Sequence, residues 1–357
     1  MISVPFGLYR ATRRKSRRVR GGNWLRVGLI GAGRIASIHA ETVARHPDVE
    51  SLTIFDPIRE AAEGLAQQHG ARAVDSEDRL LGGVDAVVIT SPTDTHVEYL
   101  IMAAERGLPA FCEKPIALSV EETDRAIAAI EKAEISVQIG FQRRFDPGYG
   151  TAHDLVASGR LGELLLVTAH THDPAPPPED YVARSGGVFK DMLIHDIDAI
   201  RFVSGREVVA VYATGSNLTM PVFEAHGDLA SVVVAAHLEG GALAILSGSR
   251  RDPLGYDVRM EVFGTEDSVA VGLDPHAPIR SLEKGVPPPV EPVTRGWLDR
   301  FREAYVGEMR AFIDVAAGAR KSPCTPRDGR AAIVVAEACG RSAQTGTPVP
   351  VQDAEPG

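Results

Sequence analysis

Cysteine is scarce in this chain. Only Cys112, Cys324 and Cys339 occur among 357 residues, and no two of them form a CxxC pair. A disulfide-stapled secreted fold and a cysteine-based zinc site are therefore excluded. The pattern is typical of a reduced, cytoplasmic protein in which each cysteine is a small buried side chain.

Long apolar runs are missing too. No stretch reaches the roughly 18 consecutive apolar residues that cross a bilayer, so no membrane-spanning helix is expected. Basic residues are outnumbered, because 38 Lys and Arg face 48 Asp and Glu, for a net charge of −10. An acidic surface repels phosphate backbones, so neither nucleic acid nor a membrane is expected as a partner.

The N-terminus is the exception to this acidic balance. The first twenty residues contain seven Lys and Arg and no acid. No apolar segment follows them, as it would in a secretory signal. We predict that residues 1–23 are a disordered basic tail outside the fold. A nucleic-acid arm, a membrane-surface patch and a targeting signal are the alternatives.

The rest of the chain has the length and composition of two globular domains. In residues 24–145, short Val- and Ile-rich runs alternate with helical segments, which predicts a parallel, doubly wound α/β sheet. In residues 146–347, long β runs interrupted by EGGA and GTED turns predict an α+β domain with a large, mostly antiparallel open sheet. Within it, residues 274–296 are Pro-rich and irregular, and residues 348–357 are expected to be a tail.

The first strand and helix carry a dinucleotide-binding fingerprint. Gly31, Gly33 and Ala36 follow the GxGxxG/A spacing between a β-rich run and a helix. The first glycine permits a tight turn, the second lets the backbone approach a pyrophosphate, and the small alanine permits close packing of helix on strand. Free N–H groups at the helix start, where Arg34 and Ile35 lie, would bind that pyrophosphate.

Asp56 ends the second predicted strand, 25 residues after Gly31. A carboxylate at this position accepts hydrogen bonds from the adenosine ribose and repels a 2′-phosphate, which predicts NAD rather than NADP as the cofactor. Arg59 is the only cation nearby. The alternative is that the aspartate only caps the next helix.

Two further motifs, SPTDTH and EKP, follow the fourth and fifth predicted strands. They supply six candidate cofactor-binding residues: Ser91, Pro92, Thr93, His96, Glu113 and Lys114. Both motifs lie at the carboxyl ends of parallel strands, where such sheets bind ligands. Taken alone, the lysine is better explained as a solvated side chain at a strand end.

Residues 187–205 predict one helix with an unusual polar stripe. Apolar residues recur at helical spacing on one face, while Asp191, His195 and Asp198 share another. Such groups are costly to bury without partners. Two interpretations are open: a catalytic stripe that faces a cleft, or a polar face that is wet or pairs with Arg201.

The order and spacing of these motifs resemble the Gfo/Idh/MocA oxidoreductase family, and most closely its inositol 2-dehydrogenase branch. The resemblance spans about residues 25–345 and rests on GLIGAGRIASIHA, SPTDTHVEYLIMAAERG, EKPIALSVEET, GFQRRFDP and the Gly-Gly-then-Asp-x-x-x-His segment. It implies a Rossmann domain, an α/β domain with a large open sheet, NAD as cofactor, and a homodimer or homotetramer formed through that sheet. It also implies that Lys114, Asp191 and His195 carry the chemistry.

Two residues depart from the family pattern: Ala36 replaces the third glycine, and Thr93 stands where relatives often have asparagine. Three residues are candidates for substrate contact: Arg144, His172 and Asp173. The arginine is equally well explained by a structural pair with Asp146. Asp198 is expected to be structural and Asp196 to face away. No histidine–carboxylate set has a convincing third ligand, so no metal is predicted.

The expected function follows from these residues together. Histidine titrates near neutrality, so His195 suits a base, while Lys114 would stabilise a developing alkoxide and Asp191 would orient the lysine or a hydroxyl. We therefore expect NAD-dependent oxidation of a secondary alcohol on a cyclic polyol, in the manner of a myo-inositol 2-dehydrogenase. The alternatives are the same chemistry on a pyranose sugar, an NAD-requiring glycosidase, and a non-enzymatic NAD sensor.

Overall fold

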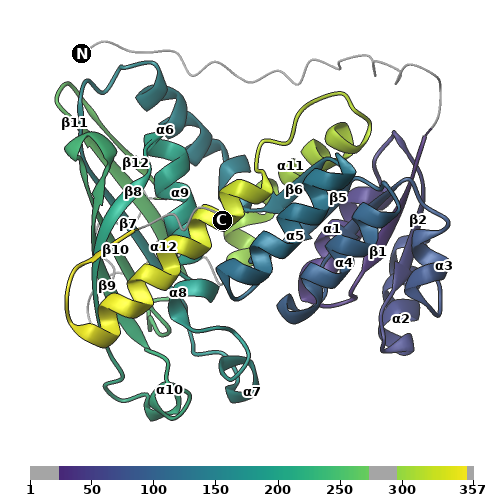
Figure 1. The fold of residues 1–357 in the computed structure, drawn as a ribbon, viewed down its shortest axis with the longest axis horizontal. Helices are drawn as coiled ribbons and strands as arrows, with labels where there is room; N and C mark the ends of the chain where they lie inside the picture. Colours follow the sequence, from purple (N-terminus) through teal and green to yellow (C-terminus); the bar gives the residue numbers. More distant parts are fainter. Residues whose placement is uncertain (1–23, 273–295, 352–357) are drawn as a thin grey trace, which may run out of the picture.

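The computed structural model describes residues 24–272 and 296–351. The predictions of a tail at 1–23 and of an irregular stretch at 274–296 fall outside this part, apart from residue 296. The described chain forms two β-sheets with helices packed against them (Figure 1).

The first sheet is the predicted parallel, doubly wound sheet. Its strand order is β3-β2-β1-β4-β5-β6, and every neighbouring pair is parallel. The strands are β1 (Leu25–Ile30), β2 (Val49–Phe55), β3 (Arg72–Ala73), β4 (Ala86–Ile89), β5 (Ala110–Glu113) and β6 (Val137–Gly140). The connecting helices are α1 (Arg34–Ala44), α2 (Arg59–His69), α3 (Glu77–Leu81), α4 (His96–Glu105) and α5 (Val120–Ala133).

Helices cover both faces of this sheet because its strands are apolar on both faces. Every residue of β4, β5 and β6 is buried. In β1, Leu29 packs into the cluster formed with α1 and α2, whereas Ile30 packs into the cluster formed with α4 and α5. Alternate side chains therefore supply two cores, as expected for strands buried on both sides.

The second sheet has the order β12-β11-β7-β10-β9-β8-β13. Its neighbours are antiparallel except β7 and β10, so the sheet is mixed but mostly antiparallel, as predicted. The strands are β7 (Leu164–His172), β8 (Val208–Ser216), β9 (Ser231–Leu238), β10 (Leu243–Ser249), β11 (Asp257–Gly264), β12 (Ser268–Val271) and β13 (Val349–Pro350).

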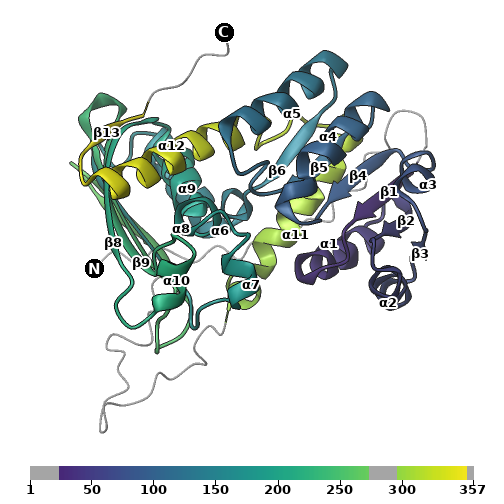
Figure 2. The same ribbon diagram turned by 60° about the horizontal axis from the view of Figure 1, so that its bottom comes forward.

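Helices pack on one face of the second sheet. They are α6 (Pro147–Ala157), α9 (Ile194–Ser204) and α12 (Pro326–Thr345), and no helix of the described ranges covers the opposite face (Figures 1 and 2). Three short helices lie between β7 and β9 in the chain: α7 (Glu179–Val182), α8 (Val188–Asp191) and α10 (Pro221–Ala225).

The predicted domain division needs two corrections. Helix α11 (Trp297–Ala316) belongs by position to the second domain, yet Met309 and Phe312 pack with side chains of β1 and α1 in the first. An amphipathic pattern reveals that a helix has an apolar face, but not which sheet that face covers. In addition, Val349 and Pro350 of the predicted tail form β13, which pairs with β8.

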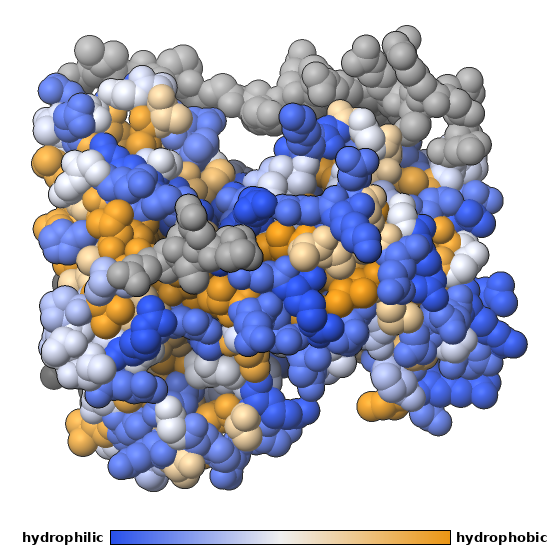
Figure 3. Space-filling model, in the orientation of Figure 1, coloured by the Kyte–Doolittle hydropathy of each residue, from blue (hydrophilic) through white to orange (hydrophobic). Residues whose placement is uncertain are grey.

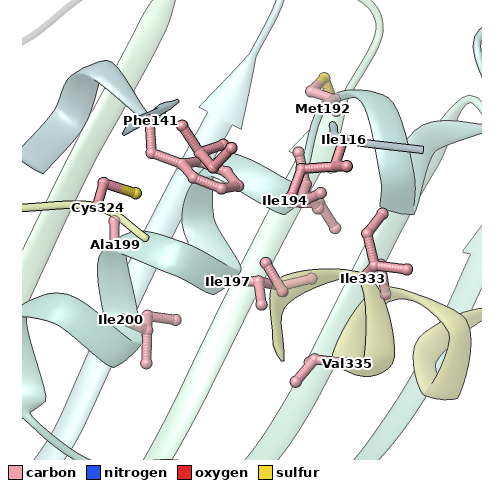
Figure 4. Close-up of a cluster of buried hydrophobic side chains, with 14 of the residues drawn as sticks. Ile116, Phe141, Met192, Ile194, Ile197, Ala199, Ile200, Cys324, Ile333 and Val335 are labelled. Carbon is pink, nitrogen blue, oxygen red and sulfur yellow. The ribbon is translucent and has the colours of Figure 1, made fainter. Parts of the chain in front are cut away.

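A buried apolar cluster joins the two sheets (Figure 4). Ile116 follows β5 and Phe141 follows β6, whereas Ile197 comes from α9 and Ile333 from α12. All four side chains are at most 2% exposed. The loops at the carboxyl ends of the parallel strands are thus fixed against the helices of the second sheet.

The surface seen in Figure 3 is mostly hydrophilic over α2 and α3, whereas hydrophobic side chains are scattered over its left and centre. Among residues 24–272 and 296–351, no helix combines the length and the apolar character required to span a bilayer.

Candidate active site

The turn between β1 and α1 leaves its backbone accessible. Gly31 has φ +93°, and a Cβ at this residue would lie 2.6 Å from the backbone nitrogen of Ser91, so only glycine fits. Gly33 precedes α1, which has no side-chain cap, and a Cβ at Gly33 would meet nothing within 4 Å. Open space beside uncapped helix N–H groups suits a pyrophosphate. Arg34 and Ile35 begin the helix at this point.

Asp56 joins the turns after β1 and β2. Its Oδ2 accepts a hydrogen bond from the backbone N–H of Ala32 at 2.7 Å, and its Oδ1 accepts one from Ile58 at 2.8 Å. The bond to Ile58 is a local turn contact two residues along the chain, and α2 has no side-chain cap, so Asp56 does not cap the next helix. The Asp56 carboxylate can still accept hydrogen bonds from a ribose, because a carboxylate has about four acceptor sites. Arg59 is paired with Glu63 at 2.7 Å.

The predicted role of His96 requires a correction. Its ring nitrogens lie 2.8 Å from the carbonyl oxygen of Pro115 and 2.9 Å from that of Ser91, and the residue is 1% exposed. His96 therefore joins the loops after β4 and β5 from inside and has no surface to offer a cofactor. Pro92 and Thr93 begin the short 3₁₀ turn that precedes His96, and Pro92 is exposed.

The predicted helix over 187–205 is in fact two helices, α8 and α9, separated at Met192 and Leu193. In a continuous helix the N–H of His195 would bond the carbonyl of Asp191. Here it bonds the carbonyl of Met192 instead, at 3.3 Å. The free Asp191 carbonyl oxygen accepts a hydrogen bond from Lys114 Nζ at 2.7 Å. The break in the helix therefore places the lysine beside the polar stripe.

The carboxylate of Asp191 is held by two hydrogen bonds and one ion pair. Tyr181 Oη donates to Oδ1 at 2.7 Å, Arg250 Nη1 donates to Oδ2 at 2.9 Å, and Lys114 Nζ lies 3.7 Å from Oδ1. Burial raises the pKa of Asp191, but Lys114, Arg250 and the hydrogen bond from Tyr181 more than offset it and hold the pKa below its usual range. Asp191 is therefore an ionised acceptor at neutral pH.

His195 follows in the first turn of α9, partly buried, with its ring edge-on to Phe141 at 6.2 Å between centroids. Burial, together with the positive charges of Lys114 and Arg143, lowers the pKa of His195 well below 6.5. The imidazole is therefore neutral at neutral pH and has a lone pair that can accept a proton.

The turn between β1 and α1 interacts electrostatically with the polar cluster formed by Lys114, Asp191 and His195. Burial is the largest effect on the pKa of Tyr181 and raises it, as does Asp191, whereas the positive charges of Arg250 and Arg34 lower it. Since Arg34 begins α1, the segment around α7 lies within electrostatic range of both the dinucleotide turn and Asp191. The arrangement can hold a nucleotide on one side and present a lysine, a carboxylate and a neutral histidine on the other.

Comparisons with known proteins agree with this geometry. The family model "Oxidoreductase family, NAD-binding Rossmann fold" matches residues 25–141, and "GFO/IDH/MocA C-terminal domain" matches residues 149–270. The chain belongs to the Gfo/Idh/MocA family. Its Rossmann domain makes it an NAD-dependent oxidoreductase, and the open turn at Gly33 fits that cofactor.

Named relatives of this Gfo/Idh/MocA chain cover almost its whole length. An inositol 2-dehydrogenase of Rhizobium meliloti is 38% identical and aligns over 89% of this chain and 96% of its own. The crystal structure of a myo-inositol dehydrogenase from Corynebacterium glutamicum has a TM-score of 0.85, is 38% identical and covers 93% of this chain and all of its own. A scyllo-inositol dehydrogenase from Lactobacillus casei, solved with NAD(H) and scyllo-inositol, has a TM-score of 0.84 at 29% identity and covers 92% of this chain and 99% of its own.

Two of the candidate substrate contacts are placed elsewhere in this Gfo/Idh/MocA structure. Arg144 is bound to Asp198, with its Nη2 at 2.6 Å, and to Asp328 at 3.1 Å, so its guanidinium serves a buried structural pair. The alternative pair with Asp146 is also wrong, because that carboxylate bonds Arg300 at 2.7 Å. Asp198 is structural, as expected.

His172 lies on the outer face of the second sheet. Side chains alternate along β7, so Thr171 faces the helices while His172 faces away, with Nε2 2.9 Å from Ser247 Oγ. Asp173 remains beside the site, since its Oδ2 lies 3.7 Å from Arg250 Nη1. Asp196 does not face away, because it is fully buried and bonds the guanidinium of Arg143 at 2.5 Å.

Sequence reasoning missed Arg250 and Tyr181. Arg250 directly follows β10, and the sequence analysis interpreted this segment only as a strand of the second sheet. A basic residue at a strand end is a weak signal, and its contact with Asp191 spans 59 positions. Tyr181 lies in a Pro-rich stretch without periodicity, so no local pattern connects it with Asp191.

Two groups of histidine and carboxylate side chains occur among the described residues. One is His172, Asp252 and Asp257, and the other is His39, Glu113 and Glu308. Glu113 turns inward to the second group, since its Oε1 lies 2.7 Å from His39 Nε2. The predicted absence of a metal stays a prediction.

Proposed function

We propose that this protein oxidises a secondary CH–OH group of a cyclic polyol, an inositol, with NAD as hydride acceptor. The observation that carries the proposal is the position of the Lys114 ammonium, held by the freed carbonyl of Asp191 beside the Asp191 carboxylate and within range of neutral His195. The inositol dehydrogenases among its relatives support this substrate class.

NAD, His195, Lys114 and Asp191 each have a separate role in the proposed reaction. Bound NAD supplies the site that accepts the hydride. His195 accepts the hydroxyl proton on its free ring nitrogen, and Lys114 stabilises the negative charge that develops on the substrate oxygen. Asp191, fixed by Tyr181 and Arg250, orients the ammonium. The proton leaves to His195 as the hydride leaves carbon, so the products are a ketone and NADH.

An absorbance assay for NADH tests the proposal. The purified protein is incubated with NAD and, separately, with myo-inositol, scyllo-inositol, other inositols and a panel of pyranose sugars. Turnover with an inositol supports the proposal, and turnover with pyranoses alone selects the sugar alternative. Glycoside cleavage that requires NAD but accumulates no NADH would select the glycosidase, and NAD binding without any turnover would select the sensor.

The rate is expected to stay high in mildly acidic solution. Because burial, Lys114 and Arg143 depress the pKa of His195 below 6.5, its neutral, proton-accepting form persists down to that lower pKa. A profile of kcat/KM against pH should therefore be flat through pH 6.5 and fall only below it. A midpoint of the acid limb at or above 6.5 would contradict this role for His195.

We further propose that two or four copies assemble through the outer face of the second sheet, and that the protein works in a reducing compartment. Large apolar side chains lie in register on that face: Tyr212 of β8 and Ile245 of β10 flank Ala235 of β9. Tyr212 is 42% exposed and Ile245 is 41% exposed. Exposed apolar side chains in neighbouring rows are typical of a protein interface.

Ile245→Asp is expected to dissociate this assembly, because it places a charge in the middle of the apolar face. Light scattering coupled to size-exclusion chromatography measures the mass of the variant. Leu218→Asp is the control, since Leu218 is 81% exposed in the loop after β8. Equal masses for the parent and Ile245→Asp would rule out this face as the interface.

A further inference from the structure

A buried cluster of three titratable side chains lies behind Lys114. His39 comes from α1, Glu113 ends β5, and Glu308 lies on α11. One nitrogen or oxygen of each lies within 4.8 Å of the others. His39 and Glu308 have no exposed surface, and Glu113 is 9% exposed. The proposed proton and hydride steps use none of the three.

Hydrogen bonds account for two of these groups and leave the third without a partner. Glu113 Oε1 lies 2.7 Å from His39 Nε2, and Glu113 Oε2 accepts a hydrogen bond from the backbone N–H of Lys114 at 3.3 Å. Both carboxyl oxygens of Glu308 lack a hydrogen-bond partner among the described residues. An ionised carboxylate in that position would be a buried, uncompensated charge beside a second carboxylate.

Among the described residues, no Lys or Arg bonds the carboxyl group of Glu308. Outside the cluster, Tyr305 and Cys324 interact electrostatically with Glu308, and burial raises the pKa of each well above its usual range, so both are neutral. Burial, followed by the charge of Glu113, raises the pKa of Glu308 well above its usual range.

His39 is engaged by Glu113 and forms no hydrogen bond with Glu308. Its Nε2 lies 2.7 Å from Glu113 Oε1, while Nδ1 is buried and has no hydrogen-bond partner among the described residues. The nitrogen–oxygen distance of 2.7 Å is a hydrogen bond, because two ligands of one tetrahedral zinc ion lie roughly 3.3 Å apart.

We propose that Glu308 is a neutral carboxylic acid in the native protein and a positioning residue for Lys114. Its uncharged form leaves Glu113 as the one carboxylate of the cluster, free to bind His39 and the backbone of Lys114. The cluster then fixes the carboxyl end of β5 against α1 and α11. The positioning role rests on the proposed function, whereas the protonation state does not.

Unfolding measured against pH tests the protonation state directly. The folded form keeps a proton that the unfolded chain releases above about pH 4.3, so stability from this group is lost as pH rises from there through the folded pKa. The folded-to-unfolded ratio of the parent, relative to that of Glu308→Gln, should therefore fall about tenfold per pH unit from about pH 5 up to the folded pKa. Glu303→Gln, an exposed residue of the same helix, is the control and should follow the parent.

Infrared spectroscopy provides a second readout. The parent should show the C=O stretching band of a protonated carboxylic acid at neutral pH, and Glu308→Gln should lack it. Identical pH slopes for the parent and Glu308→Gln, together with no such band, would overturn the proposal. A stoichiometric metal in the purified protein, measured by elemental analysis, would overturn it too.

Turnover tests the positioning role. Glu308→Gln is neutral and keeps hydrogen-bonding atoms, so its kcat should remain close to that of the parent, whereas Glu308→Met should lower kcat about tenfold or more. The Kd for NAD should change little in either variant. An unchanged kcat in Glu308→Met would refute the positioning role. If the parent oxidises no polyol, the proposed function fails, while the pH slope and infrared band still decide whether Glu308 holds a proton.

Discussion

Replacing Lys114 with methionine is expected to lower kcat for polyol oxidation by about 10²- to 10³-fold, the usual scale for losing a charge that stabilises a developing oxyanion. Methionine keeps much of the length and volume of lysine but removes the ammonium that Asp191 holds through its carbonyl at 2.7 Å and its carboxylate at 3.7 Å. The loss is electrostatic and concerns the transition state, so the Kd for NAD should stay nearly unchanged. Steady-state kinetics and a fluorescence titration with NADH measure the two quantities.

Lys132→Met is the matched control, because Lys132 is exposed in the last turn of α5. It should leave kcat unchanged. If Lys114→Met kept near-parental turnover, the assignment of the polar cluster to catalysis would be wrong. A large loss of NAD binding in Lys114→Met, with little effect on kcat, would instead make the residue a cofactor ligand.

The architecture was accessible from sequence because each sheet has a local signature. Short buried strands that alternate with helices predicted the parallel sheet, and long runs with glycine turns predicted the mostly antiparallel one. The position of α11 was not accessible in this way. Met309 and Phe312 mark an apolar face that either sheet could bury, and its choice of the first sheet depends on contacts between residues far apart in the chain.

The candidate site was predictable where a motif fixes its own geometry. Gly31 must be glycine because any Cβ would clash with Ser91, and that constraint appears in the sequence as a spacing. The helix break between α8 and α9 left no such mark, because residues 187–205 keep helical periodicity across it. The sequence therefore could not predict that the Asp191 carbonyl is free to accept the hydrogen bond from Lys114.

The sequence also failed to predict which side chains pair across distant parts of the chain. Arg144 and His172 have the right residue types for binding hydroxyls; Arg144 lies near the predicted domain junction, and His172 lies at a predicted strand end. Arg144 is instead held in a buried ion pair with Asp198. His172 faces away from the helices because side chains alternate along β7. The cation that lies beside Asp191 and Asp173 is instead Arg250, which the sequence analysis did not select.

Cofactor choice is expected to depend on Asp56, which should make the protein prefer NAD over NADP by roughly 30- to 150-fold in kcat/KM, or about 2–3 kcal/mol. Asp56 directly follows β2, where the adenosine 2′ substituent of a bound dinucleotide lies. With NAD it accepts charge-assisted hydrogen bonds from the ribose, whereas with NADP it faces a phosphate of like charge. A parent that used both cofactors equally well would refute this role.

Asp56→Ser should narrow that preference mainly by impairing NAD use. The shorter side chain loses the ribose contact, and it also gives up the two acceptor bonds that join the backbone of Ala32 to that of Ile58. Efficient use of NADP should not appear, because Arg59 is engaged by Glu63 at 2.7 Å. Comparing kcat/KM for both cofactors in the parent, in Asp56→Ser and in Asp154→Ser, an exposed aspartate on α6, tests this directly. A gain in NADP efficiency to the parental NAD level would show that electrostatic repulsion alone, and not the missing cation, excludes the 2′-phosphate.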